Sequence, residues 1–317
     1  MDQNEAQQKE REHELTKEIE LEKKPRLPDA PALLDQTIST YRSRFWDIAF
    51  VCLVLFLSST LQDIALSTNI RTLIVVVTIL NLIISILSVL AFMVAIAHPE
   101  TVIRSGSALY DQAIGLVIPY LWIIIVIGLA LIGGAVLFVI PALVLSIFLN
   151  FANYTLVVEN RRGLDALIAS WHYIEGRWWS VAWRTIFFGA LVFILSLVVN
   201  FIIFLLSSSV TAATIATYQP PLSGSIVADA WSAFIIVPAS IIYFYHLFLN
   251  LKIVNPTPPN EAQKRSIKNW VMSFVILGIV VLFLGLAFAT LSISKYLPEF
   301  LRAAPMTASV IYAPFLH

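Results

Sequence analysis

The chain has 317 residues, of which 59% are hydrophobic and only 13% are charged, and its 20 lysines and arginines balance 20 aspartates and glutamates. A water-soluble domain carries about 25% charged residues, so this composition excludes a soluble globular protein. Apolar runs of about 20 residues recur along the chain, and each is long enough to cross the hydrocarbon core of a bilayer as a helix. The sequence therefore predicts an all-α polytopic integral membrane protein.

The first 31 residues are predicted to form a polar cytoplasmic tail. Residues 1–26 hold eight acidic and six basic side chains and few apolar ones. A segment of this composition buries too little apolar surface to fold by itself, so we expect it to be disordered. It is the candidate arm for a protein partner. Pro25, Pro28 and Pro31 interrupt any helix there.

Two amphipathic helices are predicted in the headgroup layer on the cytoplasmic side, over residues 32–45 and 160–175. In the first, Leu34, Ile38 and Tyr41 share one face at helical spacing. The second has a leucine-, isoleucine- and tryptophan-rich face, and Gly176 is placed to end it. Arginine and tryptophan beside such helices favour contact with lipid phosphates and the interface. The expected headgroup or interface residues are Arg42, Arg44, Arg161, Arg162, Arg177, Trp171, Trp178 and Trp179.

Seven apolar runs are predicted to span the membrane. Gly133-Gly134 is expected to reverse the chain between the third and fourth, because residues 113–157 in one helix would be about twice the bilayer thickness. Without that reversal the alternative is six spans. Residues 207–229 are expected to form a loop, 255–269 a polar connector and 292–317 a C-terminal tail. The spans are predicted at about 48–66, 72–97, 113–132, 135–157, 181–206, 230–251 and 270–291.

The distribution of lysine and arginine sets the predicted orientation. With a cytoplasmic N-terminus, fourteen basic residues near the membrane fall on the cytoplasmic side, and only Arg71, Lys295 and Arg302 fall on the other. Basic residues are enriched in cytoplasmic loops. The sequence therefore predicts a multi-pass protein of the cell membrane, with the N-terminus in the cytoplasm and the C-terminus outside.

No pattern in the sequence indicates catalysis. Ionisable groups at mid-depth in a span would point to a functional site, but the acidic residues fall near predicted span ends. HExxH, GxSxG and Walker-loop motifs are missing, and no cysteine–histidine spacing suits a metal. We therefore expect no enzyme activity, no catalytic residue, no metal and no cofactor. No nucleic-acid partner is expected either.

The polar side chains inside the spans allow two interpretations. Asparagine, serine and threonine commonly hydrogen-bond between membrane helices, with about 1 kcal/mol per bond, and would then only hold the bundle together. Alternatively, they line a path for a solute. The candidates for such a path are Asn81, Asn150, Asn153 and Asn200. Small residues four apart, such as Gly285 and Ala289, permit helices to approach closely.

Residues 137–183 carry a combination of short motifs: an Ile-Pro pair in an apolar helix, a glutamate at its end, a glycine before Ala-Leu, a Ser-Trp pair and a Gly-Arg-Trp-Trp re-entry. These are Ile140-Pro141, Glu159, Gly163, Ala166-Leu167, Ser170-Trp171 and Gly176-Arg177-Trp178-Trp179. In this stretch the chain resembles the membrane domain attached to some bacterial and archaeal glycerophosphodiester phosphodiesterases, together with its stand-alone multi-span relatives of unknown function. It departs from them at Ala142, where the family often has glycine. The soluble phosphodiesterase domain has no counterpart, so the resemblance implies a membrane fold and not that activity.

The leading functional hypothesis is a non-enzymatic membrane protein that organises or senses lipid, or holds a protein partner. Membrane lipids are the expected partners, and the N-terminal tail is the candidate contact for a protein. The alternative is a transporter or permease for a small or amphiphilic solute, which would use the asparagine path.

Overall fold

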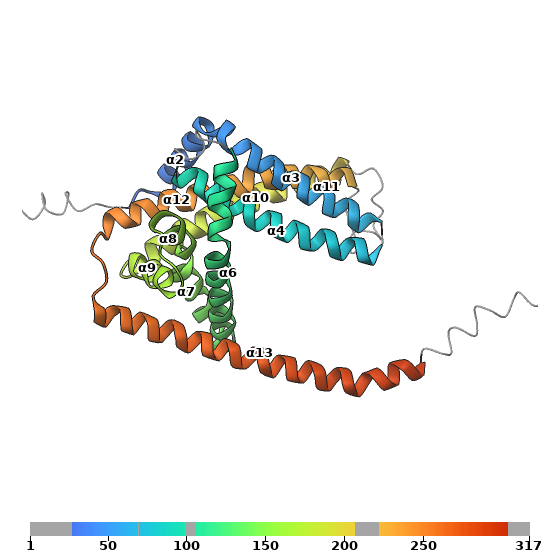
Figure 1. Ribbon diagram of the computed structural model, residues 1–317. Coiled ribbons are helices and arrows are strands. Elements are labelled where there is room, and N and C mark those ends of the chain that lie inside the picture. The colour runs from blue at the N-terminus through green and yellow to red at the C-terminus, as the bar shows by residue number, and fades with distance from the viewer. Residues whose placement is uncertain (1–26, 69, 99–105, 207–221, 304–317) are drawn as a thin grey trace, which may run out of the picture. The chain divides into compact units, whose positions relative to one another are not determined.

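The computed structural model describes residues 27–68, 70–98, 106–206 and 222–303, and all regular elements within these ranges are helices (Figure 1). The predicted all-α fold is confirmed. Seven helical stretches in these ranges are long and apolar enough to cross a membrane, which is the predicted number. The chain is therefore a polytopic membrane protein. Residues 1–26 of the predicted tail lie outside the described residues.

The first surface helix and the first hairpin follow the predicted ranges closely. α2 (Ala30–Ser43) begins just inside the predicted tail, and Pro31 lies in its first turn, where a backbone N–H is not needed. α3 (Phe45–Ser67) and α4 (Arg71–Ala97) pack side by side (Figure 1). Their short connection allows only an antiparallel pair.

The third and fourth spans separate at Phe138 and not at the predicted Gly133-Gly134. α6 (Gly106–Leu137) continues through both glycines, and α7 (Val139–Leu149) follows. Pro141 explains the position of the break, because a proline is tolerated in the first turn of a helix but would remove a hydrogen bond from the interior. α8 (Ala152–Glu159) then completes the fourth span.

The second predicted surface helix and the fifth span are present as α9 (Leu164–Ile174) and α10 (Trp178–Leu206). Gly163 precedes α9 with φ of 60°, and Gly176 follows it with φ of 76°. These are left-handed conformations that glycine adopts without steric strain. Gly176 therefore ends the helix as predicted.

The sixth span is longer than predicted. α11 (Leu222–Trp231), the π-helical turn η2 (Ser232–Ile236) and α12 (Val237–Val254) form one continuous helical stretch. The predicted loop over 207–229 is thus helical from Leu222, and its earlier part lies outside the described residues. Pro238 lies in the first turn of α12, and the wider π turn before it accommodates the hydrogen bond that proline cannot donate.

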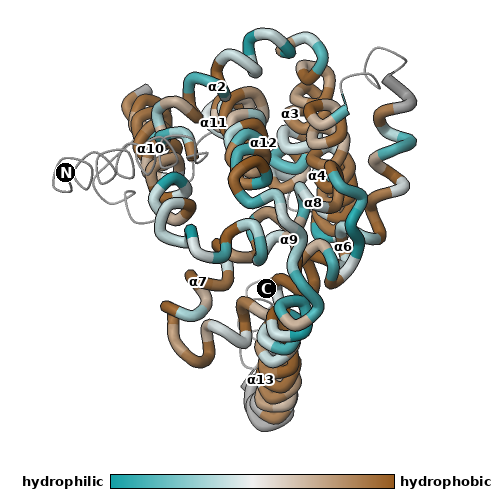
Figure 2. Tube along the Cα trace, turned by 90° about the vertical axis from the view of Figure 1, so that its left-hand side faces the viewer, coloured by the Kyte–Doolittle hydropathy of each residue, from teal (hydrophilic) through white to brown (hydrophobic). Residues whose placement is uncertain are grey.

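The last helix extends beyond the predicted span at both ends. α13 (Glu261–Ala303) begins inside the predicted connector and runs on into the predicted tail. Its first turns are polar and the following ones are apolar (Figure 2). The prediction treated polarity as a sign of a loop, whereas a helix can continue past the membrane surface into water.

The polar segment before α13 is attached to α9. Asn255 Nδ2 donates to the His172 carbonyl oxygen at 2.9 Å, and His172 Nε2 donates to the Thr257 carbonyl oxygen at 2.6 Å. A carbonyl can only accept, so this contact places the His172 proton on Nε2. The segment is therefore fixed to α9 by one bond in each direction.

The described residues fall into two compact units. The first lies within Met1–Ile123 and Ile147–Asn260, and the second within Ile124–Ser146 and Glu261–His317. In the second unit, α6 and α13 touch at glycines: a β-carbon on Gly133 would clash with the Phe274 carbonyl oxygen, and one on Gly278 with the Leu129 carbonyl oxygen. Gly285, which the sequence offered for close packing, faces open space.

Candidate lipid-headgroup interface

The turn between α8 and α9 brings a buried carboxylate together with two cations. Asn160 adopts the left-handed conformation with φ of 53°, which ends α8 and reverses the chain after Glu159. Glu159 Oε2 lies 2.6 Å from Arg161 Nε, and Glu159 Oε1 lies 3.1 Å from Lys252 Nζ on α12. The Glu159 side chain is only 9% exposed. The carboxylate therefore lies below two cationic groups that reach the surface.

Tyr173 of α9 completes this arrangement. Its hydroxyl donates to Glu159 Oε1 at 2.7 Å. Burial, together with the hydrogen bond to Glu159, raises the pKa of the Tyr173 phenol, so it stays protonated and continues to donate. We refer to Glu159, Arg161, Tyr173 and Lys252 as the Glu159 cluster. Sequence reasoning named only Arg161 as a functional member, because Tyr173 and Lys252 come from helices whose packing was unknown.

The helix α9 is packed inside the protein over most of its surface. Eight of its eleven residues are buried, and it contacts α8 and α12. The sequence predicted a helix lying in the headgroup layer, but the same apolar residues instead face neighbouring helices. Periodicity shows that a helix has an apolar face and does not show whether lipid or protein covers that face.

Ser170 and Trp171 serve packing at the α7–α8 break. The Ser170 hydroxyl donates to the Phe148 carbonyl oxygen at 2.7 Å and accepts from the Phe151 N–H at 3.1 Å. The Trp171 ring stacks on Phe148, with centroids 4.2 Å apart. Trp171 was predicted as an interface residue, and the structure places it against this break.

Arg177, Trp178 and Trp179 stand together at the start of α10. The Trp178 and Trp179 rings meet edge to face with centroids 4.6 Å apart, and Trp179 is 80% exposed. Arg177 is half-buried and has no ion pair or side-chain hydrogen bond with any described residue. A guanidinium without a carboxylate partner beside exposed indole rings matches the chemistry of a membrane interface.

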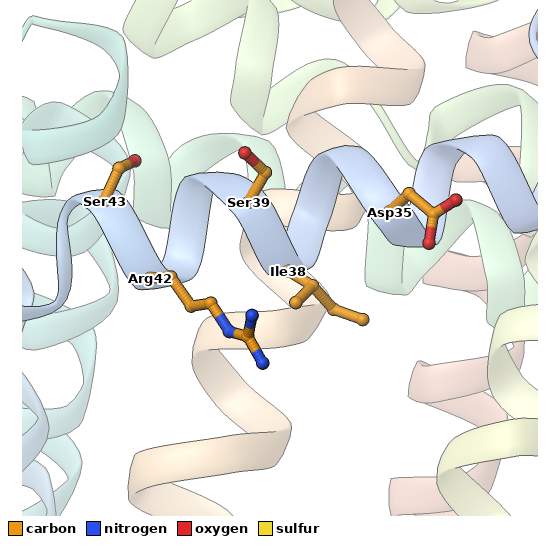
Figure 3. Close-up of a pocket in the computed structure, with 5 residues that line it drawn as sticks. All are labelled: Asp35, Ile38, Ser39, Arg42 and Ser43. Atoms are coloured by element: carbon orange, nitrogen blue, oxygen red, sulfur yellow. The ribbon is translucent and has the colours of Figure 1, made fainter.

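The two arginines near the end of α2 have different surroundings. Arg44 Nη1 donates to the Ala95 and Ile96 carbonyl oxygens at 3.4 and 3.2 Å, so it caps the C-terminal turn of α4. Arg42 is exposed and has no such bond to the described residues. Figure 3 shows the guanidinium of Arg42 projecting from α2 beside a shallow hollow. The hollow is lined by Asp35, Ile38, Ser39, Arg42 and Ser43.

A further arginine, Arg184 of α10, holds the segment before α2. Its Nε donates to the Pro28 carbonyl oxygen at 2.7 Å and its Nη2 to the Leu27 carbonyl oxygen at 3.0 Å. Near the C-terminal end of α2, the Tyr41 hydroxyl donates to the Phe234 carbonyl oxygen at 2.6 Å, and Thr40 bonds His246 at 2.8 Å. The first surface helix is therefore docked on α10, η2 and α12 by side-chain bonds that periodicity does not reveal.

The four asparagines of the alternative path have separate surroundings. Asn81 accepts from the Ser58 hydroxyl at 2.5 Å and donates to Gln62 Oε1, so it links α4 to α3. Asn200 is exposed and bonds the Ser196 carbonyl oxygen of its own helix. Asn153 Oδ1 is buried without a hydrogen-bond partner among the described residues, and Asn150 is half-buried. In the part of the chain that the structure describes, no hydrogen bond joins any two of the four.

The described residues contain no group of three or more histidine, cysteine, aspartate or glutamate side chains that could hold a metal. Comparison of the chain with protein-family models, with curated proteins and with solved structures finds no match to any of them. The site must therefore be interpreted from its own chemistry.

Proposed function

We propose that this membrane protein has a non-enzymatic role in binding and organising anionic lipid. The proposal rests on a difference among the arginines: some have an acceptor within the protein and others have none among the described residues. Arg44 and Arg184 donate to carbonyl oxygens of the protein and Arg161 forms an ion pair with Glu159, whereas Arg42 and Arg177 have no protein acceptor among the described residues. The second pair retains its hydrogen-bond donors for oxygens outside the protein, and lipid phosphates supply such oxygens.

Exposed tryptophans support the same role. Trp46 at the start of α3 is 85% exposed. On α10, Trp179 is 80% exposed and Trp183 is 66% exposed. Indole rings with a polar edge favour the headgroup level of a bilayer. Arginine and tryptophan therefore coincide at two helix starts, those of α3 and α10, at the end of the first unit where α2 is docked.

In the proposed orientation, the protein is a multi-pass protein of the cell membrane and this end of the first unit faces the cytoplasm. Arg42, Arg44, Arg177 and Arg184 lie near it, and Arg71 begins α4 after the first span. That distribution supports a cytoplasmic N-terminus, and seven spans then put the C-terminus outside. Attachment of a protein partner to the N-terminal tail stays a prediction.

The family resemblance also stays a proposal. Ser170, Trp171, Gly163 and Gly176 have roles in turns and packing in this chain. Such roles are what a stand-alone membrane domain without a catalytic partner would require. The transporter alternative also stays a prediction, and the separate surroundings of the asparagines give it no support.

The test is native mass spectrometry of the protein extracted from its own membrane, comparing wild type with an Arg42→Gln, Arg177→Gln double variant. We expect anionic phospholipid on the wild type and at least about tenfold less on the double variant, because each charge-assisted bond contributes about 1.5–3 kcal/mol. Arg71→Gln, an exposed arginine at the other end of a span, is the matched control. Equal loss in the control, or retention of zwitterionic lipid alone, would contradict the proposal, and a retained non-lipid solute would favour transport.

A further inference from the structure

The Glu159 cluster has more hydrogen-bond donors than the protein itself uses. Arg161 engages Glu159 through Nε, and its two terminal nitrogens have no acceptor among the described residues. Lys252 gives one contact to the same carboxylate. A guanidinium carries five N–H groups and an ammonium three, so most of these donors remain available.

Exposure places those donors at the surface. The Glu159 side chain is 9% exposed, whereas the side chains of Arg161 and Lys252 are 36% and 46% exposed. The carboxylate thus fixes the two cations from below and leaves their outer sides accessible. Two positive groups held on one carboxylate give a local net charge of +1, and Arg162, exposed in the same turn, adds another. Asp165 in the first turn of α9 is the nearest further acid along the chain.

The backbone at the start of α9 also favours an anion near Arg161. Arg161, Arg162 and Gly163 lead directly into α9, and no side chain caps its first turn. The unpaired N–H groups of a helix start carry partial positive charge. An anion held by Arg161 would therefore also experience the favourable end of this helix, and the tetrahedral oxygens of a phosphate suit several donors converging from different directions.

We propose that Arg161 and Lys252 form a binding site for a phosphate group, with Glu159 as the positioning residue that holds the guanidinium and the ammonium side by side. This inference deepens the proposed lipid-binding function by naming a second site and its ligand chemistry. It does not depend on Arg42 or Arg177. The phosphate belongs either to a phospholipid headgroup or to a soluble phosphate compound.

The first experiment measures binding in nanodiscs, with two probes that separate these sources. One set contains phosphatidylcholine with a minor fraction of phosphatidic acid, and the other contains phosphatidylcholine alone with inorganic phosphate added to the buffer. Wild type is expected to bind one of the probes, and Arg161→Gln or Lys252→Gln to weaken that binding at least about tenfold. Binding in the first set alone assigns the site to lipid, and binding of inorganic phosphate assigns it to a soluble ligand.

The controls exclude a general effect of charge or folding. Lys252→Arg keeps the cation and should retain binding, and Lys268→Gln removes an exposed cation of α13 that is not in the cluster. Arg161→Gln and Lys252→Gln each keep Tyr173 and one cation on Glu159. The unfolding temperature of every variant without ligand verifies its fold. Neither probe binding wild type, or equal binding by Lys252→Gln and wild type, would overturn the proposal. Loss of lipid in the Arg42, Arg177 double variant would leave this result unaffected.

Glu159→Gln distinguishes positioning from net charge. The substitution makes the turn more positive, so general electrostatic attraction predicts tighter binding of phosphate. Loss of the carboxylate also frees Arg161 and Lys252 to move apart, so a positioned site predicts weaker binding despite the added charge. Tighter binding in Glu159→Gln would overturn the role of Glu159.

Discussion

Arginine has two opposite uses in this protein. Arg44 and Arg184 donate to backbone carbonyl oxygens of other elements, and in doing so they satisfy acceptors that have no partner within their own helix or segment. Arg42 and Arg177 make no such bonds in the described residues. The residue type alone therefore does not identify a headgroup contact, and the available donors have to be counted in the folded chain.

The asparagines also differ in their roles, because some link two helices and others bond only their own helix. Substitution tests this difference. Asn81→Leu removes bonds to Ser58 and Gln62 and leaves them without that partner between α3 and α4. We expect it to lower the free energy of unfolding by about 1 kcal/mol, measured as thermal unfolding in detergent. Asn200→Leu is the control, since Asn200 is exposed and bonds only its own helix. A larger cost for Asn200→Leu than for Asn81→Leu would refute this assignment.

At the scale of the element, helix ends are completed by side chains from distant parts of the chain. Arg44 caps α4, and Ser170 of α9 bonds both sides of the break between α7 and α8. Neither partner is close in sequence to the end that it completes. Local cap preferences therefore could not reveal them, although the breaks themselves follow from Pro141, Asn160 and Gly176.

Arg44→Ala should destabilise the first unit. It removes a charged donor from the last turn of α4, where cations also interact favourably with the helix dipole. We expect a loss of about 1–2 kcal/mol in the free energy of unfolding, detected as a lower unfolding temperature. Arg42→Ala, two residues earlier and exposed, should change that temperature little in detergent. Similar effects of the two variants would show that the cap contributes nothing measurable.

The glycine contact between α6 and α13 gives an independent prediction for the second unit. A side chain at Gly278 would clash with the Leu129 backbone, so Gly278→Leu must force the two helices apart. Overpacking of this kind costs about 1–3 kcal/mol or more, and we expect lower yield of folded protein and a lower unfolding temperature. Gly285→Leu is the matched control on the same helix, because nothing lies within 4 Å of its β-carbon position.

At the scale of the whole molecule, hydropathy was enough to predict the class of fold and the seven spans, because lipid selects long apolar helices. Prediction was wrong where polarity was equated with loops, as at Leu222 and Glu261, and where Gly133-Gly134 was taken as a turn. For the candidate site, the sequence was enough to predict Arg161 as a headgroup contact. Lys252 lies 91 positions after Arg161 (252 − 161), and only folding brings it to Glu159.

The orientation can be tested by labelling single cysteines in intact cells. In a Cys52→Ala background, Ser43→Cys reports the end of α2 and Ser67→Cys the end of α3, and both native serines are exposed. With a cytoplasmic N-terminus, a membrane-impermeant thiol reagent should label Ser67→Cys in intact cells and Ser43→Cys only after lysis. The reverse pattern would invert the proposed topology.

The docking of α2 sets an order of events during synthesis. Its side-chain partners on η2 and α12 lie 193 and 206 positions later in the chain. At a ribosome rate of about 5–20 residues per second, roughly 10–40 s pass before those partners exist. During this interval α2 lacks its partners on η2 and α12, and the bilayer surface is available to its apolar side chains. A helix that first lies on the bilayer surface thus docks late, and Ile38, which is 44% exposed in the folded protein, keeps an apolar group on its outer side.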